Sequence, residues 1–306
     1  MRFAVLAFAA LVIAAPRAAL AQAGQKNADF ITPHISDAHH IEVPSLSLKG
    51  NLTREIDLPQ WAPVHIGPLT VDFSPTKHVV MMLLAFTICV VALVGAARSQ
   101  ARHAASGRPP KGAANALEAT VLYLRNEIIL PNVGHHGEAF VPYCLTLFFF
   151  ILVMNLLGLL PWGASATGNI SVTATLAICS FIVVEVAGMR ALGTKYFSTI
   201  FFWPHDMALG LRIPMTLIMT PIEFISKLTK PVALAIRLFA NMTAGHVLVL
   251  ALISLVFTFG SWVILPAPLF AATAIMVLEL LVAFLQAFVF TLLVAVFIGQ
   301  IRESAH

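Results

Sequence analysis

The chain ends in two apolar stretches that are each longer than an upright membrane helix. Residues 231–265 contain Arg237 and His246 as their only ionisable side chains, and residues 270–301 contain only Glu279. Roughly 20 helical residues cross a hydrocarbon core of about 30 Å, whereas stretches of this length would reach about 48 to 52 Å as helices. We therefore expect two long helices that are strongly tilted.

The overall composition is that of a membrane protein. Of the 306 residues, 59% are apolar and 10% are charged, against about 25% charged in an average soluble domain. This excludes an ordinary soluble protein, a disordered chain and a nucleic-acid-binding tail. Cys89, Cys144 and Cys179 each lie inside an apolar run without C-x-x-C spacing, so neither a disulfide framework nor a zinc site is indicated.

Apolar stretches predict an all-α polytopic membrane domain over residues 78–306, with about five crossing helices. Three crossings are expected at residues 79–97, 139–160 and 170–189, followed by the two terminal stretches. Residues 113–130 place apolar side chains on one side of a helix, which is typical of an amphipathic interfacial helix. Pro266 and Pro268 are predicted to lie in the hairpin between the two strongly tilted last helices.

The basic residues predict the orientation of these helices. Cytoplasmic loops carry an excess of Lys and Arg, and the short loops near Gly163 and Gly260 carry none. The N terminus is therefore expected outside, and the C terminus with Arg302 in the cytoplasm. The basic residues assigned to the inner side are Arg98, Arg102, Arg108, Lys111, Arg125, Arg190, Lys195 and Arg212.

The first 77 residues precede this domain. Residues 1–23 begin with a basic Arg2, continue with an apolar stretch and end at the small residue Ala23, which is the pattern of a cleaved signal peptide. An uncleaved first span is the alternative, but Pro16 interrupts it.

Residues 24–77 form a proline-rich extension, which we expect outside the cytoplasm with short strands. His34, His39 and His40 could suggest a metal cluster, but no helical or hairpin spacing fixes them, so a solvated loop is the better interpretation.

The charges within the terminal stretches indicate a functional site, because an arginine in hydrocarbon costs at least about 2.5 kcal/mol. On neighbouring antiparallel helices, residues at one depth have a nearly constant sum of residue numbers. By this test Arg237 lies level with Gln286, and His246 lies level with Glu279. His and Glu exchange protons but Arg does not, so a fixed cation would interrupt a proton path unless a moving partner with a carboxylate carried the proton past it.

The helical period assigns these residues to faces. Asn241 lies about 40° from Arg237, and Glu223 falls on the same side if Pro231 does not break the helix. His246 comes out about 180° away, toward the last helix. Small or apolar residues flank the arginine on its face: Ala233, Ile236, Ala240 and Ala244.

Glu185 lies in a different environment, near the inner end of its span and close to Arg190. We interpret it as a member of a structural ion pair.

Two sequence segments carry a family resemblance. KPVALAIRLFANMTAGH, residues 230–246, resembles the signature helix of subunit a (subunit 6) of the F-type ATP synthase, and LLVAFLQAFVFTLL, residues 280–293, resembles its last helix. The order of elements from about residue 70 to 306 also fits, including the NLLGLLP segment that ends at Pro161. The signal peptide and the proline-rich extension depart from the compact family pattern.

The resemblance implies the stator half of a proton channel in a bacterial inner membrane. The subunit would not be an enzyme on its own, and would need no cofactor and no metal. Its partners would be the rotor ring of c subunits, the b-subunit peripheral stalk, the remainder of the complex and the lipid bilayer, without nucleic acid. The implied roles are a rotor-facing charge at Arg237, polar neighbours at Asn241 and Gln286, an outer half-channel relay at His246 and Glu279, and an inner half-channel residue at Glu223.

Two other classes also place ionisable residues at mid-membrane. A proton-coupled secondary transporter is the main alternative, but the sequence shows no internal repeat of the kind such transporters carry. A membrane haem or copper enzyme needs facing histidines, whereas only His246 lies well inside a span and His78 lies at an edge. The residues alone leave both proton and sodium coupling open.

Overall fold

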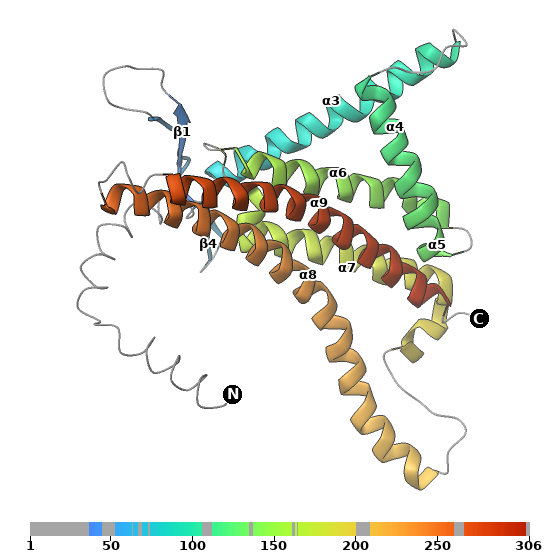
Figure 1. Cartoon of the computed structure of the whole chain (residues 1–306). Helices are drawn as coiled ribbons and strands as arrows, with labels where there is room; N and C mark the ends of the chain where they lie inside the picture. Colours follow the sequence, from blue (N-terminus) through green and yellow to red (C-terminus); the bar gives the residue numbers. More distant parts are fainter. Residues whose placement is uncertain are drawn as a thin grey trace, which may run out of the picture.

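A computed structural model describes residues 37–44, 53–62, 64–66, 69–72, 74–105, 112–134, 137–160, 163, 165–199, 209–259 and 266–303. The expected signal peptide and the part of the extension that contains His34 lie outside these residues. The described chain is mainly helical (Figure 1).

Among the described residues, five helices are long and apolar enough to cross a membrane, as predicted. An α-helix satisfies its backbone groups internally, which a span in lipid requires. The expected crossing at 79–97 continues further as a helix, because the basic segment after it is also helical. The five helices are α3 (Lys77–Ala105), α6 (Val141–Gly158), α7 (Ile170–Leu192), α8 (Leu209–Phe259) and α9 (Pro266–Glu303).

The expected amphipathic helix at 113–130 is present but is not a uniform α-helix. It comprises α4 (Ala113–Tyr123), a π-helical turn η1 (Leu124–Ile129) and α5 (Leu130–Val133). Its end packs on α9, where Arg302 donates a hydrogen bond to the carbonyl of Val133 at 3.3 Å. Gly299 makes this approach possible, because a Cβ there would overlap the carbonyl oxygen of Asn132.

The two last helices both begin earlier in the chain than the apolar stretches that predicted them. α8 has 51 residues and begins well before residue 231, passing through Pro214, Pro221 and Pro231. Neighbouring groups satisfy the backbone carbonyls that proline frees in membrane helices, so these prolines do not end the helix.

The placement of Pro266 and Pro268 in the hairpin was wrong, because both belong to the first turn of α9. The missing N–H of proline costs nothing in that turn. At 1.5 Å per residue α8 would reach about 76 Å, so it cannot stand upright in a core of about 30 Å. Figure 1 shows its second half beside α9 and its first half diverging from the bundle.

The core lies between α6, α7, α8 and α9. Small residues of α9 allow the helices to approach closely, among them Ala283, Ala287 and Ala295, which are fully buried. Large apolar side chains remain exposed along α3, the first half of α8 and the first half of α9, as expected for surfaces in contact with lipid or a partner.

The described part of the extension contains four short strands, in agreement with the prediction. β1 (His40–Pro44) pairs antiparallel with β2 (Thr53–Asp57), and β3 (Val64–Ile66) pairs antiparallel with β4 (Leu69–Val71). A backbone hydrogen bond of 3.0 Å from the N–H of Lys77 to the carbonyl of Ala38 joins the extension to the start of α3.

Candidate functional site

Arg237 lies on the exposed face of α8. Asn241, Ala233 and Ala240 are exposed on the same face, and so are Ile236 and Ala244. The opposite face is buried against the bundle through Leu234, Leu238 and Met242. Within the residues that the structure describes, no hydrogen bond or ion pair joins Arg237 to another side chain. The guanidinium is therefore presented to whatever covers this face.

Glu223 is exposed on the same helix, 14 residues before Arg237. The helical period predicts Glu223 on the same side as Arg237 on the condition that Pro231 does not break the helix. α8 is continuous across Pro231, so this condition is met. Their separation along the axis is about 21 Å at the helical rise.

His246 and Glu279 line one cavity of about 210 Å³, which we call the polar cavity. His78 of α3 and Thr243 of α8 also line it. The carboxylate of Glu279 lies against Gly245, where a Cβ would overlap it. His246 and Glu279 share this cavity, but no hydrogen bond or ion pair joins them in the described structure.

Four buried polar atoms at this cavity have no hydrogen-bond partner among the described residues. They are His78 Nδ1, Thr243 Oγ1, His246 Nε2 and Glu279 Oε1. Buried polar groups are normally paired with protein or water, and a water needs about 30 Å³. The cavity therefore has the volume and the polar groups to hold a short chain of water molecules.

Gln286 lies in a different setting from Arg237. Its side chain is only 3% exposed, within the interior between helices. The contact of Gly245 with Glu279 sets the antiparallel register of α8 and α9, and this register places Gln286 level with Leu238 and hence close to the depth of Arg237. No hydrogen bond joins Gln286 and Arg237 in the part of the chain that is described.

A second group of charges, which we call the Lys227 cluster, lies between α7 and α8. Lys227 Nζ is 3.6 Å from Glu185 Oε2, and both side chains are about one-seventh exposed, at 15% and 14%. Lys227 also donates to Thr199 Oγ1 at 3.0 Å and lies 4.7 Å from the centre of the Tyr196 ring. Glu185 is therefore in an ion pair as interpreted, but its partner is Lys227 and not the nearby Arg190.

Sequence reasoning missed a buried hydrogen-bond chain between α6, the turn before α7, and α9. Asn155 donates to the carbonyl of Ala283 at 3.3 Å and accepts from Thr167 at 2.8 Å, and Thr167 in turn is 2.8 Å from Ser165 Oγ. The sequence feature that could have indicated this chain is Asn155, the single asparagine in the apolar run 139–160.

No group of three or more His, Cys, Asp or Glu side chains in the described structure is arranged to hold a metal ion. Cys89, Cys144 and Cys179 are free thiols.

Comparisons with known proteins decide the family. The profile of the family described as "ATP synthase A chain" matches residues 79–299. "ATP synthase subunit a" of Chloroherpeton thalassium is 45% identical over 80% of this chain and 73% of its own length. "ATP synthase subunit a 2" of Chlorobaculum tepidum is 42% identical over 94% and 76%, and "ATP synthase subunit a" of Anaeromyxobacter dehalogenans is 41% identical over 87% and 68%.

The chain belongs to the ATP synthase A chain family. This membership confirms the resemblance found in residues 230–246 and 280–293 and decides against a secondary transporter. It also makes the chain a non-catalytic membrane subunit, as expected, and connects its helices with proton translocation in an F-type ATP synthase.

Proposed function

We propose that the chain conducts protons through two offset half-channels that are separated by Arg237. The observation that carries this proposal is the separation of environments on α8: Arg237 is on the exposed face, whereas His246 faces a polar cavity on the other side. A guanidinium keeps its proton at all physiological pH values, so it would block direct passage between the half-channels.

The polar cavity would be the outer half-channel. His246 and Glu279 carry side chains that can gain and lose a proton, and the water that the cavity can hold would connect them. The inner half-channel would include Glu223, which is exposed about 21 Å from Arg237 on the same helix. Asn241 and Gln286 would provide polar surroundings near the depth of Arg237.

The partner of the Arg237 face would be the rotor ring of c subunits. A cation in hydrocarbon is costly, so the exposed guanidinium requires a carboxylate or water outside this chain. The small side chains of Ala233, Ala240 and Ala244 would let a curved rotor surface slide past. The b-subunit peripheral stalk and the remaining subunits would hold the chain against that motion.

The orientation follows from the basic residues. In a bacterial inner membrane the C-terminal end and the basic loops would face the cytoplasm, and the strands of the 24–77 extension would lie outside after removal of the signal peptide 1–23. The polar cavity is lined by His78 at the start of α3, next to the extension, and would therefore lie toward the outer side.

The test is the replacement of Arg237 in the complete ATP synthase, reconstituted into liposomes. Arg237→Ala should abolish ATP synthesis driven by a proton gradient, and Arg237→Lys should nearly abolish it, because an ammonium lacks the planar multi-donor head. Arg125→Ala is the matched control, since Arg125 forms a largely exposed pair with Glu138 at 3.5 Å. Normal synthesis by Arg237→Ala in an assembled complex would refute the proposal.

A further inference from the structure

The polar cavity ends at a histidine that the proposed half-channels do not use. His78 lies in the first turn of α3, is 3% exposed and lines the cavity together with His246 and Glu279. Its two ring nitrogens have different surroundings. Nε2 is 3.9 Å from Asp37 Oδ1, whereas Nδ1 is buried without a hydrogen-bond partner in the described chain. The ring therefore lies between a carboxylate and a cavity.

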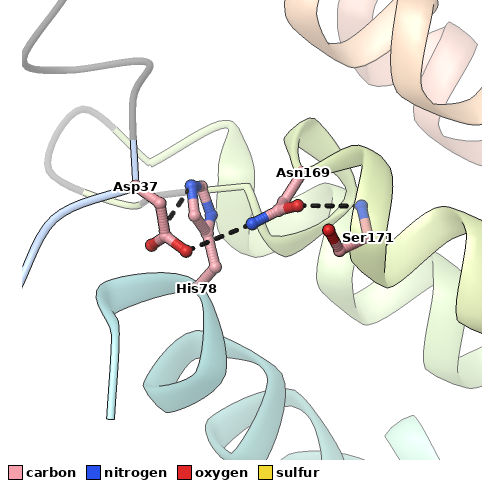
Figure 2. Close-up of polar contacts among 4 residues, drawn as sticks. All are labelled: Asp37, His78, Asn169 and Ser171. Atoms are coloured by element: carbon pink, nitrogen blue, oxygen red, sulfur yellow. Dashed lines mark hydrogen bonds and ion pairs between the residues drawn. The ribbon is translucent and has the colours of Figure 1, made fainter. Parts of the chain in front are cut away.

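Asp37 is held in place by the start of another helix. Figure 2 shows its carboxylate joined by dashed lines to both the His78 ring and the side chain of Asn169. Asn169 donates from Nδ2 to Asp37 Oδ2 at 3.2 Å, and its own Oδ1 caps α7 by accepting from the N–H of Ser171 at 2.9 Å. The backbone bond from Lys77 to Ala38 fixes the segment that carries Asp37.

The exposure of the three groups forms a gradient. The Asp37 side chain is 35% exposed and so meets the solution, whereas His78 is almost fully buried. Behind His78 lie the unpaired polar atoms of Thr243, His246 and Glu279. A carboxylate that is about one-third exposed, a buried imidazole and a cavity that can hold water therefore follow one another in the order that proton entry needs.

We propose that Asp37 and His78 form the proton entrance of this cavity. The inference rests on the proposed function, because it adds two residues to the path that leads to Glu279. Asp37 takes a proton from solution and passes it to His78 through one water molecule, because 3.9 Å is too long for a direct hydrogen bond. The O–H bond of the carboxylic acid breaks as the water accepts that proton, and one O–H bond of the water breaks as an N–H bond forms at Nε2. The imidazolium then releases its Nδ1 proton to cavity water, and the neutral ring rotates so that its nitrogens exchange roles for the next proton.

The charged or titratable groups that face the ring define the expected pH dependence. They are Asp37 from the extension, Lys77 from its own helix, and His246 and Glu279 across the cavity. Imidazole changes charge between about pH 5 and 8, so a relay through His78 should make the rate of synthesis depend on the outside pH in that range.

The experiment uses the complete ATP synthase in proteoliposomes, with the extension side facing the proton source. A potassium diffusion potential drives synthesis in place of a pH gradient. Imidazole is added in one of the controls, and this membrane-permeant base would dissipate a pH gradient. We expect His78→Gln and Asp37→Asn to slow synthesis about tenfold, since a positioned proton-transfer group contributes on the order of 10²-fold or more and water replaces part of it. Both variants should flatten the pH profile.

The controls separate a relay from a structural role. His65→Gln and Asp57→Asn change exposed residues on β3 and β2 and should leave the rate unchanged. Imidazole added to the source buffer should restore synthesis by His78→Ala, relative to the wild type in the same buffer, because a diffusing base can replace the lost ring. Co-purification of the c subunits reports assembly, and Asp37→Asn decides the question if a His78 variant does not assemble.

The outcomes distinguish this inference from the function on which it rests. In one outcome, Arg237→Ala abolishes synthesis while Asp37→Asn and His78→Gln match their controls at every pH. That result would refute the Asp37–His78 entrance and leave the proposal of two half-channels separated by Arg237 intact. Slow synthesis with an unchanged pH profile and no rescue by imidazole would also refute it. If Arg237→Ala has no effect, the proposed function itself fails.

Discussion

The polar cavity and the Lys227 cluster both place ionisable side chains between membrane helices, but they differ in how those side chains are paired. In the cluster, Lys227 has a carboxylate, a hydroxyl and an aromatic ring around it, and the adjoining cavity is only about 50 Å³. In the polar cavity of about 210 Å³, four buried atoms of the described chain have no partner. Paired charges hold helices together, whereas unpaired groups in a cavity can exchange protons with water.

The largest expected effect tests the structural half of this comparison. Lys227→Met leaves Glu185 buried without its partner, which typically costs about 3 to 5 kcal/mol. We expect much less assembled complex and a lower Tm of the purified membrane sector. The double change Glu185→Leu with Lys227→Met should recover most of the loss, because no charge is left unpaired.

Arg190→Gln serves as the control for this experiment, since Arg190 is an exposed cation near the end of the same helix as Glu185. If Lys227→Met assembles normally but conducts far fewer protons per complex, the Lys227 cluster is part of the proton path. The distinction between a structural cluster and a proton-exchanging cavity would then be wrong.

A smaller effect is expected from Gly245→Ala, which tests the functional half. The added Cβ would displace the flexible carboxylate of Glu279 without disturbing backbone packing. Misplacing a reacting group by about 1 Å can cost up to about 10²-fold, so we expect synthesis to fall about tenfold with normal assembly.

Gly95→Ala is the matched control, because a Cβ at Gly95 meets nothing within 4 Å. An unchanged rate of synthesis in Gly245→Ala would argue that the position of the Glu279 carboxylate does not matter for flux.

The smallest effect is expected on the local stability of the extension. There the Asp72 carboxylate is hydrogen-bonded to Ser74, although it is exposed to solvent. Hydrogen bonding by the Ser74 side chain, and then by the Ser74 backbone N–H, lowers the pKa of Asp72. The Ser74 nitrogen lies 2.8 Å from Asp72 Oδ1. Because the folded pKa is depressed, this contribution to stability is present above the unfolded pKa of about 3.9 and is lost as the pH falls through the folded pKa.

Hydrogen exchange at the amide of Ser74 measures this effect. Exchange in the wild type should accelerate only below about pH 4 relative to neighbouring amides, whereas Asp72→Asn should remove this acid dependence. Protection that is independent of pH in the wild type would contradict the expectation.

Much of the site followed from local periodicity. The helical repeat around Arg237 put Asn241 and the small residues on the same exposed face as the arginine, and put His246 on the opposite side, where it lines the polar cavity. The antiparallel register likewise put Glu279 beside residue 245, next to His246. These inferences worked because helix geometry is fixed and the apolar length of a span is set by the bilayer.

Other features depended on contacts between distant segments. The partner of Glu185 proved to be Lys227 on another helix, and Asp37 reaches His78 and Asn169 only because the extension folds back onto the bundle. Sequence distance carries no information on such pairs, since any of several carboxylates and cations could meet once the helices pack.

By itself, the sequence determined the helical membrane class, the five spans and the face of Arg237, because burial in lipid imposes a local pattern on every span. Only the tertiary structure decided that α8 continues through Pro231 and which polar atoms are paired. Whether a proline ends a helix, or a buried nitrogen finds an acceptor, depends on the neighbouring helices that satisfy the freed groups, and their positions are fixed only when the bundle is assembled.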